Sequence, residues 1–214
     1  MATPLTAVTA FGVLKDVAKV QEWAGWRTRN RGSRGDGWGP VNGIMVHHTV
    51  TADSESAIKL CRDGHADLPG PLYPILIDKK GTVHLVGWGR CNHAGAGDSD
   101  VLAAVIAERY PLPKPNDART DGNARFYGVA LLNMGSASDK VPAAQRKALV
   151  NVLAALVHAH KGWTGDSVIG HKEWQAGKID PLMSMKGLRA DVEKRRKELA
   201  APPKPKPTPP GKCS

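Results

Sequence analysis

The chain has 214 residues, of which 41% are hydrophobic and 23% are charged. These fractions are ordinary for a globular protein, and the length suits one domain of about 150–200 residues with short appendages. Lys and Arg total 30 against 20 Asp and Glu, so the formal net charge is +10. Such a charge points to a polyanionic partner: nucleic acid, a membrane surface or an anionic cell wall.

Simple counts exclude two classes of protein. No run of about 18 apolar residues is present, so we expect no membrane-spanning helix. The three cysteines, Cys61, Cys91 and Cys213, are too few and too scattered for a disulfide scaffold. The N-terminus has no basic segment before its short apolar stretch, which predicts no secretory signal and folding in a reducing cytoplasm.

The predicted elements begin with an N-terminal extension over residues 1–38. It holds a short helix within residues 6–23 and then the loop WRTRNRGSRGDGWGP, rich in Gly and Arg. Over residues 39–199, apolar runs of strand length alternate with stretches of helical periodicity. We predict strands at 43–50, 72–77, 82–87, 127–133 and 167–170, and helices at 53–63, 98–109, 142–160 and 185–199. This order predicts an α/β fold with a single mixed central β-sheet flanked by helices.

Residues 200–214 form a Pro/Lys-rich tail that contains six of the 16 prolines. Proline fixes φ and has no backbone N–H, so we predict an extended, solvated spacer. A spacer of this kind normally leads to another module. We therefore expect that a C-terminal module has been removed or that the tail itself makes contacts, and a terminus without a role is the alternative.

The pair His47 and His48 lies on the strand predicted at residues 43–50, where successive side chains face opposite sides of a sheet. One of the two can therefore face a functional site while the other packs elsewhere, and the alternation alone does not say which. His158 and His160 lie near the C-terminus of a predicted helix. There an imidazolium interacts favourably with the helix dipole, which is a sufficient structural role.

The segment GHKEWQAGKIDP at residues 170–181 brings together His171, Lys178 and Asp180. A His from each of two strands and a carboxylate are ligands that Zn²⁺ takes in open catalytic sites, where water fills the fourth position. Zinc lowers the pKa of such a water to about 7, and a nearby Lys can stabilise the oxyanion of a tetrahedral intermediate. A long surface loop without chemistry is the alternative reading.

Other chemical motifs are weak or absent. Gly87-Trp88-Gly89 and Gly95-Ala96-Gly97 each lack the third glycine of a dinucleotide-binding fingerprint. The sequence has no phosphate-binding loop of the G-x-x-x-x-G-K-[ST] type, no HExxH and no Cys-based zinc pattern. The His and Asp set is therefore the strongest candidate site.

Four fragments occur in a defined order: VHHT at 46–49, LYPILI at 72–77 followed by GTV at 81–83, NHAG at 92–95, and the segment 170–181. Together they resemble the type-2 N-acetylmuramoyl-L-alanine amidase family. That family includes phage endolysins, bacterial wall amidases and animal peptidoglycan recognition proteins. The resemblance covers roughly residues 39–185 and implies their α/β fold and a zinc-dependent hydrolase.

The resemblance also implies which residues bind the metal. It selects His47 over His48 as the first zinc ligand. The His that opens the late segment, His171, is implied as the second ligand, and Asp180 as the third.

The same resemblance implies roles for four further positions. Lys178 is implied to stabilise the oxyanion, and Tyr73 to lie beside the metal-bound water. Asn92 and His93, in the NHAG fragment, are implied to line the substrate groove.

One departure from the family pattern concerns the general base. Some members carry a Glu two residues after the Gly of the strand predicted at 127–133, and it acts on the metal-bound water. Here Ala130 stands at that position, and Leu132 replaces an acidic residue common in related phage sequences. The chain thus resembles the branch that relies on Tyr and Lys.

The implied reaction is hydrolysis of the amide bond between N-acetylmuramic acid and L-alanine, with Zn²⁺ as cofactor and bacterial peptidoglycan as substrate. A non-catalytic peptidoglycan-binding module is the alternative, because some relatives bind without cleaving. A metal-dependent nuclease, suggested by the charge of +10 and the paired histidines, has no supporting nuclease signature.

The positive charge is concentrated at the flanks, in the loop before residue 38, in residues 186–198 and in the tail. This placement, away from the predicted zinc loop, suits anionic cell-wall polymers better than nucleic acid. The resemblance to this amidase family, with no secretory signal and a Pro/Lys spacer, implies a phage endolysin, and we expect a monomer without a nucleic-acid or membrane partner. It is expected in the host cytoplasm until a holin opens the membrane, and then at the wall, with a wall-binding domain missing after the linker.

Overall fold

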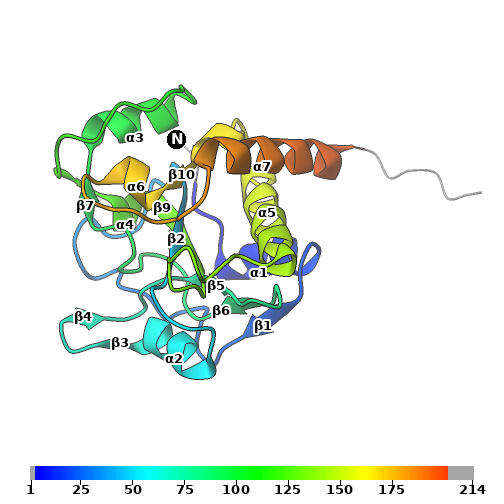
Figure 1. The fold of residues 1–214 in the computed structure, drawn as a ribbon. Helices are drawn as coiled ribbons and strands as arrows, with labels where there is room; N and C mark the ends of the chain where they lie inside the picture. Colours follow the sequence, from blue (N-terminus) through cyan, green and yellow to red (C-terminus); the bar gives the residue numbers. More distant parts are fainter. Residues whose placement is uncertain (1–2, 202–214) are drawn as a thin grey trace, which may run out of the picture.

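Six strands form one mixed sheet, in the order β1-β6-β5-β9-β2-β10, in the computed structural model of this chain (Figure 1). The structure describes residues 3–201. Adjacent strands are parallel except β5 and β6, which form an antiparallel hairpin. The strands are β1 (Val20–Glu22), β2 (Gly43–His48), β5 (Ile75–Ile77), β6 (Val83–Leu85), β9 (Phe126–Leu131) and β10 (Val168–Gly170). The predicted α/β class with a single mixed central sheet is confirmed.

Helices cover both faces of this sheet, and two short ladders lie outside it. The helices are α1 (Ala7–Lys15), α2 (Glu55–Asp63), α3 (Ser99–Ile106), α4 (Gly122–Arg125), α5 (Ala143–His158), α6 (His171–Trp174) and α7 (Met185–Ala200), with a 3₁₀ turn η1 (Gly165–Ser167). The ladders are β3 (Gly64–His65) with β4 (Leu68–Pro69) and β7 (Ala96–Gly97) with β8 (Thr120–Asp121). Within the described residues no helix is both long and apolar enough to span a membrane.

The two faces of the sheet bury different cores. One face carries Ile44 and Val46 and packs against α1, α5 and α7, which form the larger hydrophobic cluster. The other face carries Met45, which packs against residues of α3 and α6 in a second hydrophobic cluster. On the same face, residues of α2 pack against Leu76 and Ala130 in a third, smaller cluster. In Figure 1, α5 and α7 accordingly lie on one side of the strands and α3 and α6 on the other. His47 continues the Met45 face by alternation.

The predicted helix over residues 6–23 is wrong in its second half. Helix α1 ends at Lys15, and Val20–Glu22 then forms the edge strand β1, parallel to β6. Three residues are too few to show a strand period, and the pairing with β6 decides their conformation. Ala10 and Leu14 of α1 are fully buried in the main core, so the predicted extension is built into the domain. Most of the predicted tail, residues 202–214, lies outside the described residues.

The helix predicted at 142–160 is observed as α5, and one apolar face of it is buried. Leu149, Val152, Leu153 and Leu156 all have zero exposure. Helix α3 begins just after Asp98, the first residue of the helix predicted at 98–109, and the Asp98 carboxylate caps it by accepting hydrogen bonds from the Asp100 and Val101 amides at 2.8 and 2.9 Å. These local signals were therefore sufficient to place both helices.

A close approach between a strand and a loop shapes the Met45 face. The imidazole of His93 lies against Gly128 of β9, where a Cβ would stand 2.7 Å from His93 Cγ. Carbon atoms pack at about 3.5–4.0 Å, so no larger residue fits at position 128 unless the ring moves. Gly128 thereby allows the His93 side chain to pack closely against β9.

We predict that Gly128→Ala lowers the free energy of unfolding by about 1–3 kcal/mol, the usual cost of overpacking a core. Gly12→Ala is the matched control, because Gly12 is exposed on α1 and a Cβ there meets no atom within 4 Å. That control is expected to be neutral or to stabilise by up to about 1 kcal/mol, since Ala favours helix. Denaturant unfolding measures both changes, and equal stability of the two variants would contradict the close packing at Gly128.

Candidate metal centre

Three side chains converge at the carboxyl end of the central sheet. His47 lies near the end of β2, His171 directly follows β10, and Asp180 lies in the loop between α6 and α7. Gly170 pairs with Val46, so the next residues along these parallel neighbours are His171 and His47. Their ligand atoms, with that of Asp180, all lie within 4.8 Å of one another.

The two histidines present the same ring nitrogen to the carboxylate. His47 Nδ1 lies 3.0 Å from Asp180 Oδ2, and His171 Nδ1 lies 3.2 Å from the same oxygen. The three residues are at most 9% exposed. Sequence alternation left His47 and His48 equivalent, and the structure places His47 in this cluster.

The outer nitrogens of both rings face acceptors, which determines where the protons sit. His171 Nε2 lies 3.2 Å from the carbonyl oxygen of Ala94 and donates to it. His93 Nε2 likewise donates to the Phe126 carbonyl at 3.2 Å, which leaves His93 Nδ1 to accept from His47 Nε2 at 3.1 Å. In the neutral form each imidazole carries one proton, and these contacts place it on Nε2, which leaves the Nδ1 atoms that face Asp180 bare.

This proton arrangement fits a bound metal cation. Burial lowers the pKa of His47 to about 4, so the ring is neutral near pH 7. Two bare Nδ1 lone pairs and a carboxylate oxygen then face one another in a buried place, where uncompensated acceptors are costly. A divalent cation satisfies all three at once, and three protein ligands leave a position open for water or substrate.

Tyr73 lies next to this cluster, as the resemblance implies. Its ring centroid is 5.1 Å from that of His47. Burial raises the pKa of the phenol, and Cys61 and Asp180 add to that effect, so the hydroxyl keeps its proton at neutral pH. Tyr73 can therefore donate a hydrogen bond at the metal centre but is not a base there.

Two lysines flank Asp180 in different ways. Lys178 is exposed on the loop before Asp180 and pairs with no acidic residue in the described chain. Lys172, which the sequence did not single out, donates from Nζ to the carbonyls of Pro181 and Met183, both at 2.8 Å. Its backbone amide also donates to the Asp180 carbonyl at 2.8 Å. Lys172 thus holds the loop that carries the carboxylate.

The two residues predicted to line the substrate groove have protein partners. Both ring nitrogens of His93 are used on His47 and Phe126, and the side chain is buried behind the metal ligand. Asn92 is half-buried, and its amide donates to the Pro69 carbonyl at 2.7 Å. The structure therefore places His93 as support for His47, while Asn92 attaches the short β3–β4 hairpin.

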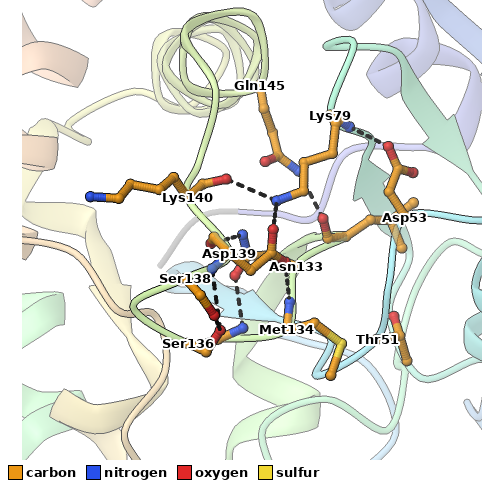
Figure 2. A network of polar contacts seen from close by, with 12 residues as sticks. Thr51, Asp53, Lys79, Asn133, Met134, Ser136, Ser138, Asp139, Lys140 and Gln145 are labelled. Atoms are coloured by element: carbon orange, nitrogen blue, oxygen red, sulfur yellow. Dashed lines mark hydrogen bonds and ion pairs between the residues drawn. The ribbon is translucent and has the colours of Figure 1, made fainter.

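His48 faces the opposite side of the sheet, where its ring lies against Gly135. The loop that contains Gly135 follows β9 and is held by the polar network of Figure 2. There Lys79 Nζ donates to Asp139 Oδ1 at 2.5 Å and to the Lys140 carbonyl at 2.9 Å. Asp139 Oδ2 accepts from the Met134 amide at 2.7 Å. This network holds the loop that follows β9.

The departure at the general-base position is also visible in the structure. Ala130 pairs in register with His47 on the neighbouring strand, and both Ala130 and Leu132 are fully buried among apolar side chains. No second carboxylate within residues 3–201 joins the His-His-Asp cluster. The chain thus has a complete ligand set and an apolar side chain where some relatives have an acid.

Several solved structures share this fold. The endolysin LysCS, an N-acetylmuramoyl-L-alanine amidase from Clostridium intestinale URNW, is 20% identical, with a TM-score of 0.50 over 81% of this chain and 95% of that one. The Ph2119 endolysin from the Thermus scotoductus MAT2119 bacteriophage Ph2119 is 16% identical, with a TM-score of 0.53 over 81% and 99% of the two chains. AmpDh3 from Pseudomonas aeruginosa, in complex with an anhydromuramic pentapeptide, is 16% identical, with a TM-score of 0.53 over 85% and 74%. At these identities the likeness concerns the fold.

The family comparison covers the whole site. A comparison with curated protein sequences found no match. The family profile described as N-acetylmuramoyl-L-alanine amidase (Amidase_2) matches residues 37–182, more than half of the chain, and this range contains all three converging side chains. The chain therefore belongs to the N-acetylmuramoyl-L-alanine amidase family and retains an intact His-His-Asp metal site.

Proposed function

We propose that this protein is a zinc-dependent peptidoglycan hydrolase that cleaves the amide bond between N-acetylmuramic acid and the L-alanine of the stem peptide. The observation that carries the proposal is the buried convergence of His47, His171 and Asp180, with bare Nδ1 atoms on both rings. Two imidazoles and one carboxylate with an open fourth position form a ligand set typical of catalytic zinc. Family membership supports the choice of bond.

The reaction adds water across one amide bond. The bond between the lactyl carbonyl carbon and the alanine nitrogen breaks, the carbonyl carbon gains a hydroxyl group, and the nitrogen leaves as an amine with the second hydrogen of water. Zinc, when bound, supplies Lewis acidity toward water and the carbonyl oxygen. The charge that develops on that oxygen must be stabilised by groups fixed in the protein.

The chain offers two groups for this task. Tyr73 keeps its hydroxyl proton and lies against His47, so it is suited to donate a hydrogen bond to water or to the carbonyl oxygen. Lys178 precedes Asp180 by two residues and extends an ammonium group from the same loop. With Ala130 in place of a carboxylate, Tyr73 and Lys178 are the side chains that we assign to orientation and charge stabilisation.

A non-catalytic peptidoglycan-binding module is the second candidate, and the buried Ala130 beside His47 is the observation that favours it. A binding module has no need for a metal site, yet all three ligand positions are filled and brought together here. We therefore favour the hydrolase. Release of stem peptides from purified walls distinguishes the two.

The biological setting that we propose is lysis of a bacterial host by a phage. Endolysins are among the proteins that share this fold, and AmpDh3 binds an anhydromuramic pentapeptide in its own structure. We propose that the enzyme acts as a monomer, remains in the host cytoplasm until a holin opens the membrane, and then reaches the wall.

Basic flanks suit attraction to anionic wall polymers. In the loop before β2, Arg31 and Arg34 form no ion pair within the described part of the chain. On α7, Lys186 and Lys194 also lack an acidic partner among residues 3–201. These charges lie outside the metal cluster and are exposed or half-buried. Exposed charges of this kind act over a range that salt limits to about 8 Å at physiological ionic strength.

We predict that Asp180→Ala loses zinc and lowers the rate of stem-peptide release at least about 10³-fold, because metal ions supply several kcal/mol of transition-state stabilisation. Asp100→Ala, an exposed aspartate in the first turn of α3, is the control and should keep both properties. Metal analysis and the appearance of new amine ends from purified walls measure the effects. An unchanged rate of stem-peptide release by Asp180→Ala would contradict the proposed mechanism.

We also predict that salt affects wall binding and amide cleavage to different extents. Rising ionic strength should weaken sedimentation of the protein with intact walls more than it slows cleavage of soluble muropeptides, because the exposed flanking charges are screened while the buried metal ligands are not. Replacing Lys186 and Lys194 by Gln should reproduce the effect of salt on wall binding. Equal losses in the two assays would contradict a role of the flanks in wall attraction.

A further inference from the structure

One oxygen atom organises the loop behind the metal centre. Asn123, at the start of α4, is 7% exposed, and its Oδ1 accepts hydrogen bonds from three consecutive backbone amides. These are the amides of His93 at 2.9 Å, Ala94 at 2.8 Å and Gly95 at 3.2 Å. Only an oxygen can face three N–H donors, so the orientation of the Asn123 amide is settled by its partners. We call residues 93–95 the backing segment.

The backing segment contacts both metal-binding histidines on the side away from the metal. His93 Nδ1 accepts from His47 Nε2 at 3.1 Å, and the Ala94 carbonyl accepts from His171 Nε2 at 3.2 Å. Each contact leaves the corresponding Nδ1 bare toward Asp180. Two ligands from different strands are therefore oriented by adjacent residues of one loop.

Asn123 is itself held firmly. Its backbone amide donates to Asp121 Oδ1 at 3.0 Å, and Asp121 Oδ2 accepts from Arg90 at 2.7 Å. The neighbouring Gly122 amide donates to the Gly95 carbonyl at 2.8 Å, which closes the other end of the backing segment. The Asn123 oxygen is thus a fixed point against which the loop is held.

From this geometry we propose that Asn123 is a positioning residue of the metal centre, which acts on His47 and His171 through the backing segment. The inference rests on the proposed zinc function and names a residue that contacts neither metal nor substrate. Loss of the Asn123 oxygen leaves the amides of buried Ala94 and of Gly95 without an acceptor, and the His93 amide keeps only the Cys91 carbonyl at 3.1 Å. The segment must then move for these amides to reach water. Both histidines then lose the partners that fix their tautomer and ring orientation.

The test is the zinc affinity of the full chain, measured on metal-free protein by competition with a chromophoric chelator. Asn123→Leu removes the acceptor and should weaken zinc binding at least about 10-fold, the usual effect of removing an outer partner of a metal ligand. Asn123→Asp keeps an oxygen toward the three amides and should restore the affinity to within about threefold of the original chain, since most of the support returns.

The matched control is Asn133→Leu. Asn133 is 4% exposed and also holds a loop through its side chain, with Oδ1 accepting from the Gly135 amide at 2.8 Å and Nδ2 donating to the Asp139 carbonyl at 2.7 Å. It supports neither metal-binding histidine. Asn133→Leu should therefore destabilise the metal-free protein, as Asn123→Leu does, and leave zinc affinity unchanged.

Two results would overturn the inference. One is an unchanged zinc affinity in folded Asn123→Leu, and the other is an equal loss of affinity in Asn123→Leu and Asn133→Leu, which would mean general loosening of the fold. If Asn123→Leu does not fold, Asn123→Ser, whose hydroxyl is too short to reach all three amides, takes its place in the same comparison. The zinc-affinity test uses zinc alone and no peptidoglycan. If the original chain bound zinc but did not cleave peptidoglycan, that result would contradict the proposed function and not the role of Asn123.

Discussion

Three acceptor atoms that face one another in a buried place are the constraint on which the rest of this structure depends. The Nδ1 atoms of His47 and His171 and the Oδ2 atom of Asp180 lie within hydrogen-bond distance, yet the outer nitrogens already hold the imidazole protons. Such an arrangement is unfavourable without a cation, because buried acceptors have lost their water. Much of the surrounding structure serves to hold these atoms together.

The fold brings these three atoms together at the carboxyl ends of its parallel strands, where α/β sheets usually bind ligands. Neighbouring β2 and β10 deliver the two histidines in register, and the loop after α6 returns the carboxylate to them. Lys172 holds that loop from one side. The backing segment holds both histidines on the side away from the carboxylate, so the histidines and Asp180 are supported by different parts of the chain.

The sequence predicted much of this arrangement, for identifiable reasons. Long periodic helices such as α5 and the capped helix α3 were visible because their signals are local. The late segment with His171 and Asp180 was found because metal-binding residue types cluster there. The choice of His47 over His48 came from a resemblance, since alternation along a strand is symmetric until the packing of its two faces is known.

Other features could not be predicted from the sequence, because they depend on contacts between residues that are far apart in it. The edge strand β1 takes its conformation from β6, 63 positions further along. Asn123 carries no recognisable motif, and its role follows only from the fold, which sets it against residues 93–95. His93 was expected in a substrate groove, whereas its two nitrogens are used on His47 and the Phe126 carbonyl.

The central claim is that His47, His171 and Asp180 hold one zinc ion through the two Nδ1 atoms and a carboxylate oxygen. Anomalous diffraction at the zinc edge from crystals of the zinc-loaded chain tests it most directly. The account predicts a single strong peak about 2.0–2.2 Å from each of these three ligand atoms. A peak bound through the Nε2 atoms, a peak elsewhere in the molecule, or no peak at this cluster would contradict it.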